Sequence, residues 1–160
     1  MTLDGPKAWS ALRPGETTTD RPISADATVQ FIGTIGAPWA SAQDCPKQGD
    51  EAGGPICFIE LVPHLAPALS GLRPGARLQI LYWLHLARRD LLLQSPRSDG
   101  NLRGTFALRS PQRPNPIASS LVRLIDIDGP VLSVRGLDCV DGTPLLDIKP
   151  EFGHLTGVAA

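Results

Sequence analysis

The chain has 160 residues, a length that one ordinary hydrophobic core can fill. Glycine and proline contribute 16 residues each, which favours many short strands joined by tight turns and disfavours long helices. The formal net charge of −1 at pH 7 excludes a broad cationic face over the whole molecule, although charge is unevenly distributed along the chain.

The cysteines and histidines show no metal-binding spacing. Cys45, Cys57 and Cys139 are odd in number and widely separated, so we expect neither a disulfide framework nor a metal site. Residues 1–16 lack the apolar core of a signal peptide, and the longest apolar run, residues 78–87, is too short to span a bilayer. The sequence therefore predicts a soluble, cytoplasmic protein with no metal and no membrane partner.

The first part of the chain predicts an extension, a strand and a long loop. Residues 1–27 are polar and are expected to form a flexible N-terminal extension. A strand is predicted over residues 28–35, where alternate positions are apolar. Residues 36–54 hold four glycines and few apolar residues, which indicates a long loop. Loops of this length inside a domain are usually functional or disordered.

Further short elements follow in the middle of the chain. Residues 56–61 predict a strand, and residues 64–71 predict one or two helical turns. Residues 78–86 form the most apolar strand candidate, which we expect to be buried on both faces. Short strands are also predicted over residues 90–93 and 104–108.

The last third of the chain contains a β-hairpin. Residues 118–127 and 131–136 flank Asp128-Gly129, and Asp-Gly readily takes the positive φ angles of a tight hairpin turn. A second such pair, Asp141-Gly142, introduces a strand over residues 145–149. Short strands with turns between them predict an all-β fold: a small antiparallel β-barrel with long loops and at most short helices.

Three polar segments are denser than ordinary turns. They are residues 45–49, residues 109–116 with their three prolines, and residues 137–144, which Asp147 and Lys149 follow. Prolines stiffen the backbone and hold side chains at low entropic cost, as a binding loop requires. A structural interpretation is also open: the third segment fits an ordinary Asp-Gly turn, and Asp147 with Lys149 fits a surface ion pair.

Arginines gather in the same part of the chain. Six of them lie between residues 88 and 113 against two aspartates, and 12 of the 15 basic residues are arginines. Because arginine binds carboxylates and phosphates in bidentate fashion, the cluster favours an anionic ligand, with a solvated loop as the alternative. The sequence lacks a phosphate-binding glycine loop and a GxSxG nucleophile turn, which excludes a Rossmann-type cofactor domain.

Two long motifs carry a resemblance to a known family. Residues 104–117 read GTFALRSPQRPNPI, and residues 136–150 read GLDCVDGTPLLDIKP. Over residues 28–152 the chain resembles the TsaA/TrmO-like (YaeB-like) family, which implies a β-barrel domain there and a C-terminal tail at 153–160. Shorter matches are FIGTI at 31–35, PKQ at 46–48 and LYWLH at 81–85.

The resemblance implies a protein that binds S-adenosylmethionine and works as a homodimer. Characterised members of the family methylate N6 of threonylcarbamoyladenosine at position 37 of tRNA. By the family's pattern, the cofactor is bound by residues from several loops: Pro46, Lys47, Gln48, Gly49, His85, Leu86, Arg109, Ser119, Arg135, Gly136, Leu137, Asp138 and Thr143.

Fewer residues are candidates for the methyl transfer itself. Such a transfer needs alignment and exclusion of water, and a carbamoylated amine becomes a better nucleophile when it loses its proton. We expect Asp147 to act as the base or to orient the amine, and Lys149 to stabilise developing negative charge, although both also fit a structural role. With RNA as substrate, five arginines would contact phosphates: Arg88, Arg89, Arg97, Arg103 and Arg113.

The chain departs from the family pattern at several substrate-side positions. Ala76 and Arg77 stand where the family has serine and histidine, Ala118 replaces a glycine, and Glu151 replaces a tyrosine. Three functions are therefore open. They are a methyltransferase acting on tRNA, a methyltransferase acting on a small molecule, and a non-catalytic dimer that binds S-adenosylmethionine.

Overall fold

The computed structural model describes residues 11–21, 24–96 and 100–151. The chain divides into two compact units: Val29–Trp83 with Ala118–Ala160, and Met1–Thr28 with Leu84–Ile117. We call the first the barrel unit and the second the small unit. The tail expected over residues 153–160 lies outside the described residues.

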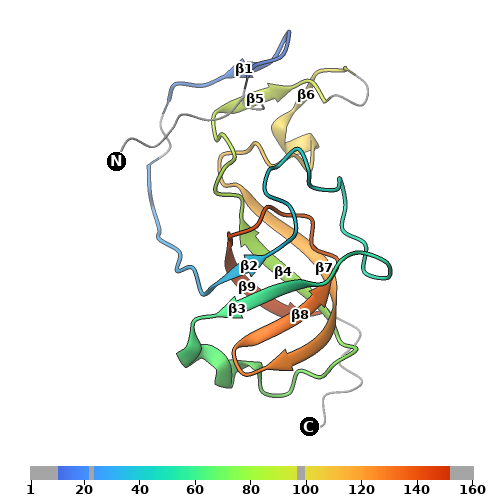
Figure 1. Cartoon of the computed structure of the whole chain (residues 1–160). Helices are drawn as coiled ribbons and strands as arrows, with labels where there is room; N and C mark the ends of the chain where they lie inside the picture. Colours follow the sequence, from blue (N-terminus) through green and yellow to red (C-terminus); the bar gives the residue numbers. More distant parts are fainter. Residues whose placement is uncertain (1–10, 22–23, 97–99, 152–160) are drawn as a thin grey trace. The chain divides into compact units, whose positions relative to one another are not determined.

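The barrel unit confirms the predicted all-β fold (Figure 1). Six strands close into a barrel in the order β2-β3-β8-β7-β4-β9. Neighbouring strands are antiparallel in the β2–β3, β3–β8, β7–β8, β2–β9 and β4–β9 pairs. The strands are β2 (Gly33–Gly36), β3 (Cys57–Leu61), β4 (Arg77–Trp83), β7 (Ile117–Asp128), β8 (Val131–Arg135) and β9 (Thr143–Pro150).

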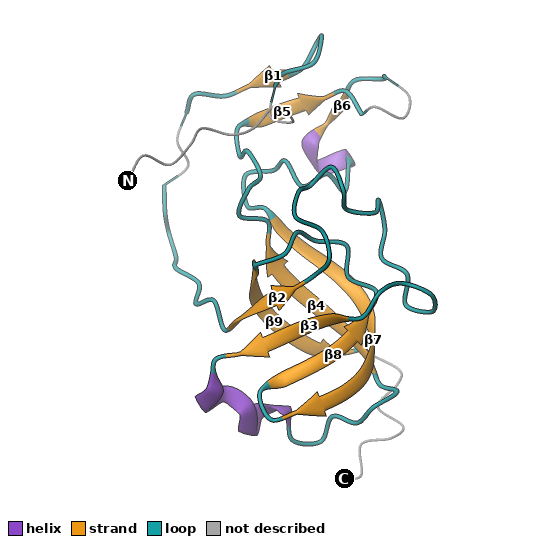
Figure 2. Cartoon of the chain, in the orientation of Figure 1, coloured by secondary structure: helices purple, strands orange, loops and turns teal. Residues whose placement is uncertain are grey.

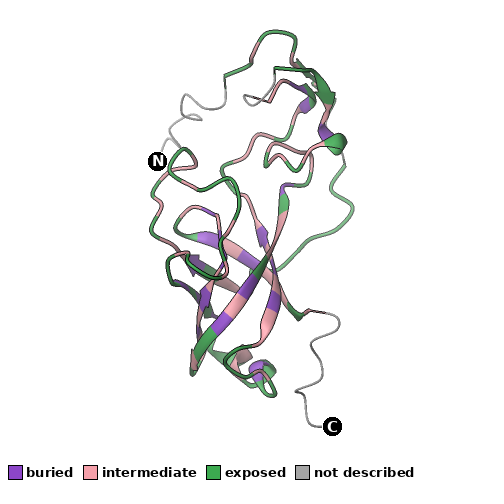
Figure 3. Ribbon diagram, turned by 90° about the vertical axis from the view of Figure 1, so that its right-hand side faces the viewer, coloured by how far each residue is buried: buried purple, intermediate pink, exposed green. Residues whose placement is uncertain are grey.

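The barrel core is built from every second residue of its strands. Figure 3 shows buried and partly exposed bands alternating along the barrel strands. On β3 and β4, the side chains of Ile59, Leu78 and Ile80 are fully buried, and Tyr82 is 2% exposed. This period of two follows because a closed barrel has one interior, which alternate side chains fill.

The expectation that residues 78–86 are buried on both faces is wrong. Gln79, Leu81 and Trp83 of β4 are only partly buried. Their side chains point to the outside of the barrel, because only every second side chain of a barrel strand points to the interior. The strand also ends at Trp83, before the predicted end.

β2 is shorter than the strand predicted over residues 28–35. Val29 and Phe31 are half exposed, and the Phe31 ring lies 6.4 Å from the Trp83 ring, centroid to centroid. Strand pairing begins at Gly33, where a Cβ would fall 2.3 Å from the Glu60 carbonyl oxygen. A glycine at this position therefore allows β2 to lie close against β3.

The small unit contains a three-stranded sheet in the order β1-β5-β6 (Figure 2). Its elements are β1 (Thr17–Thr18), β5 (Leu91–Gln94), β6 (Arg103–Gly104) and the short 3-10 helix η3 (Thr105–Ala107). Part of the expected N-terminal extension thus pairs with β5.

The strand predicted over residues 104–108 is wrong beyond Gly104. The chain turns into η3 because the buried Thr105 hydroxyl donates to the Leu91 carbonyl oxygen at 2.7 Å and accepts from Gln94 Nε2 at 2.9 Å. Both hydrogen bonds join residues far apart in sequence, so local strand propensity does not decide this segment.

Both predicted Asp-Gly turns are present. Gly129 has φ +57° between β7 and β8, and Gly142 has φ +78° just before β9. The helical turns predicted over residues 64–71 form the 3-10 helix η2 (Pro63–Leu69). At seven residues η2 is the longest helix in the described part of the chain, so no described helix reaches membrane-spanning length.

Candidate functional site

The predicted cofactor segment at residues 46–49 leads into a rigid turn. The Asp50 carboxylate accepts the N–H groups of Ala52 and Gly53, each at 2.9 Å, and the Asp50 carbonyl accepts the Gly54 N–H at 3.1 Å. These backbone hydrogen bonds, first that of Gly53, lower the pKa of Asp50 below its usual range. The long loop is thus held in one conformation directly after Gly49.

Two predicted segments meet at a contact between glycine backbones. A Cβ on Gly49 would lie 1.7 Å from the Gly136 carbonyl oxygen, a distance that no side chain tolerates. Gly136 itself has φ +116°, and a Cβ there would lie 2.6 Å from the Leu121 carbonyl oxygen. The sequence places these two segments far apart, and the fold brings their backbones into contact.

Asp138 is held by two hydroxyl groups from neighbouring barrel strands. Tyr82 Oη donates to Asp138 Oδ1 at 2.6 Å, and Ser120 Oγ donates to the same oxygen at 3.2 Å. The two hydroxyls also lie 2.7 Å apart. Burial, followed by the charge of Asp138, raises the pKa of Tyr82 far above its usual value, so the tyrosine remains a neutral donor.

Tyr82 and Ser120 were not among the predicted site residues. Tyr82 lies in the LYWLH match and Ser120 follows the predicted Ser119, but only the closed barrel shows that both hydroxyls converge on Asp138. The available signal was a tyrosine at an interior position of an apolar strand, where its hydroxyl needs a partner.

The remaining predicted residues of the barrel unit differ in their contacts. The buried Thr143 hydroxyl donates to the Val140 carbonyl oxygen at 2.6 Å, and Ser119 Oγ accepts from Gln79 Nε2 at 2.9 Å. Arg135 Nη1 donates to the Ala52 carbonyl oxygen at 3.4 Å. Its Nε is buried and has no hydrogen-bond partner among the described residues. Leu137 is buried, whereas Pro46, Lys47 and Gln48 are exposed.

The cysteines near Asp138 are poor nucleophiles. Burial, with the nearby Asp138 charge, raises the pKa of Cys45 to about 11 and that of Cys139 to about 12. Both thiols therefore stay protonated at neutral pH. Within the described residues, no three His, Cys, Asp or Glu side chains are arranged to hold a metal ion.

The predicted catalytic pair lies together on β9. Lys149 Nζ forms an ion pair with Asp147 Oδ2, and the two side chains are 56% and 43% exposed. In the β4–β9 ladder they lie opposite Gln79 and Leu81, the outward positions of β4. No hydrogen bond or ion pair within the described chain links the pair to Asp138.

Three predicted cofactor residues belong to the small unit. His85 and Leu86 are exposed in the turn that follows β4, and Arg109 is exposed after η3. The other ten belong to the barrel unit, where the contact between Gly49 and Gly136 joins two of the predicted segments.

A comparison with known families decides the affiliation of the chain. A family model described as the tRNA-methyltransferase O N-terminal domain matches residues 34–155. The chain belongs to this family.

Individual relatives of the TrmO N-terminal domain family agree with the match. A Rhizobium radiobacter protein named as a probable S-adenosyl-L-methionine-binding protein, VirR, is 49% identical over 140 residues, 88% of this chain and 79% of that protein. The tRNA (adenine(37)-N6)-methyltransferase of Escherichia coli (strain K12) is 38% identical over 131 residues, 74% of this chain and 55% of that enzyme.

A solved structure gives the same result. A crystal structure of TrmO from Pseudomonas aeruginosa is 34% identical with a TM-score of 0.66, covering 84% of this chain and 60% of that chain. This chain therefore spans little more than half the length of the Escherichia coli enzyme and of the solved TrmO chain.

Arg77 and Glu151, predicted from the sequence to depart from the family pattern, lie side by side. Arg77 Nη1 contacts both Glu151 carboxylate oxygens, at 2.7 and 2.9 Å, and the Glu151 N–H donates to the Arg77 carbonyl oxygen at 3.0 Å. The two substitutions therefore complement each other in charge and form an ion pair within the chain.

Several arginines between residues 88 and 113 hydrogen-bond to other groups of the same stretch of chain. Arg88 pairs with Asp90 at 2.7 Å, and Arg89 donates to the Pro114 carbonyl oxygen. Arg113 Nη1 donates to the carbonyl oxygens of Leu108 and Ser110, both at 3.2 Å. These groups stabilise the small unit. Arg97, predicted to contact phosphate, lies outside the described residues.

Proposed function

We propose that this protein is an S-adenosylmethionine-dependent methyltransferase whose acceptor is N6 of threonylcarbamoyladenosine 37 in tRNA. The relatives named as S-adenosylmethionine-binding proteins and as a tRNA methyltransferase support this activity. The observation that carries the proposal is the contact between Gly49 and Gly136, because it joins the two segments that the family resemblance assigns to the cofactor.

The residues around this contact suit a sulfonium nucleoside. The Asp138 carboxylate would accept from cofactor hydroxyl or ammonium groups, because both of its described hydrogen bonds end on Oδ1. The buried Arg135 Nε, which lacks a described partner, would donate to an anionic or carbonyl group. When bound, S-adenosylmethionine supplies an electrophilic methyl group.

For the transfer we propose the roles predicted for the β9 pair. Asp147 would accept the N6 proton as the bond between N6 and the methyl carbon forms and the bond from that carbon to the cofactor sulfur breaks, which leaves S-adenosylhomocysteine. Lys149 would stabilise negative charge on the carbamoyl oxygen. Their exposure supports access by a large substrate. The proposal also includes a homodimer, which the family resemblance implies, and a location in the cytoplasm, which the sequence predicts. The arginine-rich segment would face RNA phosphates.

Methyl transfer to tRNA tests this function directly. The full chain is incubated with methyl-labelled S-adenosylmethionine and tRNA, with and without threonylcarbamoyladenosine, and nucleosides are analysed by mass spectrometry. We expect one methyl group on N6 of threonylcarbamoyladenosine. Asp147→Asn and Lys149→Met should each lower kcat by about 10²-fold or more, the scale of general acid–base catalysis, with little change in cofactor affinity.

Asp126→Asn is the matched control, since Asp126 is an exposed carboxylate on a different strand, β7. It should methylate tRNA at the wild-type rate. Cofactor binding without label in any RNA would overturn the tRNA assignment in favour of a small-molecule acceptor or a non-catalytic dimer. Absence of binding heat with S-adenosylmethionine would overturn the cofactor assignment itself.

A further inference from the structure

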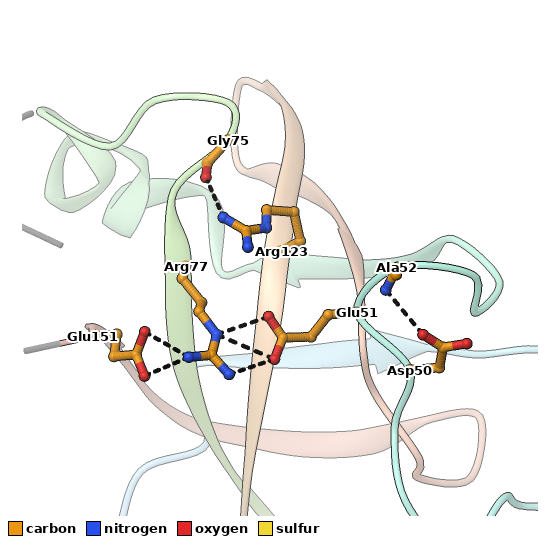
Figure 4. A network of polar contacts seen from close by, with 7 residues as sticks. All are labelled: Asp50, Glu51, Ala52, Gly75, Arg77, Arg123 and Glu151. Atoms are coloured by element: carbon orange, nitrogen blue, oxygen red, sulfur yellow. Dashed lines mark hydrogen bonds and ion pairs between the residues drawn. The ribbon is translucent and has the colours of Figure 1, made fainter.

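Arg77 lies between two carboxylates from distant parts of the barrel unit (Figure 4). On one side its Nε lies 2.8 Å from Glu51 Oε2 and its Nη2 lies 2.7 Å from Glu51 Oε1. On the other side its Nη1 contacts both oxygens of Glu151. All three side chains are between 23% and 28% exposed, so they are only partly screened by solvent. We call these three residues the arginine clamp.

The two carboxylates differ in how the rest of the chain holds them. Glu151 continues the β4–β9 ladder through its backbone bond to Arg77, so it stays with the barrel even without its side chain. Glu51 belongs to the long loop, two residues after Gly49, and Arg77 connects it to β4. The clamp therefore joins a loop to the barrel wall at Glu51, whereas at Glu151 it reinforces an existing ladder.

Glu51 also lies against the predicted cofactor turn. A Cβ on Gly136 would fall 3.0 Å from Glu51 Cγ, so the Glu51 side chain passes over this glycine. A second barrel arginine, Arg135, adds a longer contact of 3.4 Å to the Ala52 carbonyl oxygen. Fixing Glu51 consequently fixes the position of residues 46–54 against Gly136.

The charges make the clamp dependent on its arginine. Arg77 lowers the pKa of Glu51, and hydrogen bonds to the two glutamates raise the pKa of Arg77, so Glu51 and Arg77 are ionised at neutral pH. Without the guanidinium, two carboxylates would face each other across the same space and repel. The loop would then be driven away from the barrel as well as released from it.

We propose that Arg77 is a positioning residue for the cofactor site, which acts through Glu51 to hold residues 46–54 against the Gly136 turn. This inference rests on the proposed function, because it assumes that S-adenosylmethionine binds at that junction.

Calorimetric titration with S-adenosylmethionine tests the clamp in the full chain. Arg77→Met and Glu51→Gln should each raise Kd at least about tenfold, since both release the loop. Glu151→Gln should change Kd less than about threefold, because the backbone hydrogen bond between residues 151 and 77 remains. In the Arg77→Met/Glu51→Gln double variant, Kd should be no higher than in Arg77→Met. A multiplicative rise would show that the two residues act separately and overturn the proposal.

Arg73→Met is the matched control, because Arg73 is an exposed arginine in the turn between η2 and β4 of the same barrel unit. It should bind the cofactor as the wild type does.

Hydrogen exchange of the ligand-free protein gives a readout independent of the cofactor. Peptides covering residues 46–54 should exchange faster in Arg77→Met and Glu51→Gln, while peptides from β3 and β8 keep wild-type protection. Unchanged exchange in this loop overturns the inference whether or not the wild type binds S-adenosylmethionine. Faster exchange together with a wild type that binds no cofactor would instead retain the clamp and overturn the proposed function.

Discussion

At the scale of single residues, Asp138 shows how barrel strands can hold a carboxylate that the proposed function assigns to the cofactor. One carboxylate oxygen is used by hydroxyls of Tyr82 and Ser120, and the geometry of both donors is set by strands of the barrel. A carboxylate restrained in this way loses less conformational freedom when a ligand arrives. Its orientation therefore depends on residues that need not touch the ligand.

Tyr82→Phe tests this dependence. The variant removes the shorter of the two hydrogen bonds while keeping the ring in the core. We expect the free energy of unfolding to fall by about 1–3 kcal/mol, the cost of losing a bond to a charged group, and the Kd for S-adenosylmethionine to rise roughly fivefold. Urea denaturation and calorimetry measure the two effects.

Leu81→Ala is the comparison, because Leu81 is on the outer face of the same strand. It should lower stability without changing Kd. Equal Kd values for Tyr82→Phe and the wild type would contradict a role for Tyr82 in orienting Asp138.

The residues that sequence could predict are those whose role is local. Asp138 and Thr143 lie inside a continuous motif, and the Thr143 hydroxyl donates to the Val140 carbonyl oxygen within that motif. Tyr82 could not be assigned because its partner is 56 residues away and is reached only after β4 and the turn before β9 are brought together. Arg77 and Glu151, noted only as departures from the family pattern, likewise gain meaning from a contact across 74 residues.

At the scale of elements, the loop between β2 and β3 depends on the absence of two side chains. Gly49 lies so close to Gly136 that a side chain at position 49 would overlap the Gly136 carbonyl group. Because the contact is between backbones, side-chain repacking alone cannot relieve a clash there.

Gly49→Ala should therefore displace the loop. We expect about 1–3 kcal/mol of lost stability, as for other overpacked sites, and a Kd for S-adenosylmethionine at least about tenfold higher. Thermal unfolding and calorimetry provide the readouts. Gly36→Ala serves as the control, because the nearest atoms to its new Cβ lie at 3.8 Å, an ordinary contact. Tight cofactor binding by Gly49→Ala would show that the contact with Gly136 is not part of the site.

Elements set by neighbouring residues could be predicted, and those set by distant ones could not. The two Asp-Gly turns depend on two adjacent residues each, and both are present. The sequence predicts a strand over residues 104–108. Hydrogen bonds of the Thr105 hydroxyl with Leu91 and Gln94 instead favour a 3-10 turn there. The burial of β4 on one face depends on barrel closure, which an apolar run of residues does not encode.

At the scale of the whole molecule, several ion pairs and turns rely on ionised carboxylates. The pKa of Asp50 is lowered by the Gly53 N–H, that of Glu51 by Arg77 and that of Asp90 by Arg88. A group with a lowered pKa in the folded state contributes stability that is fully present above its unfolded pKa, about 4 for these side chains. That stability is lost as pH falls through the folded pKa.

Thermal midpoints should accordingly stay level between about pH 7 and pH 5 and then fall steeply toward pH 3. Differential scanning calorimetry across this range measures the curve. The Asp50→Asn/Glu51→Gln variant should have a lower midpoint at pH 7 and a shallower fall below pH 5, because it has fewer protons to take up on unfolding. Parallel curves for the variant and the wild type would contradict the roles assigned to these two carboxylates.

Closure of the barrel also bears on the order in which the protein can be completed. β2 pairs with β3 on one side and with β9 on the other, and β9 is the last strand of the ring in the sequence. During synthesis on the ribosome, β2 and β4 would each expose an unpaired edge until residues 143–150 emerge, and such edges recruit other chains. A nascent chain that stalls before β9 should therefore be a substrate for chaperones or proteases, whereas the finished chain seals both edges in one step.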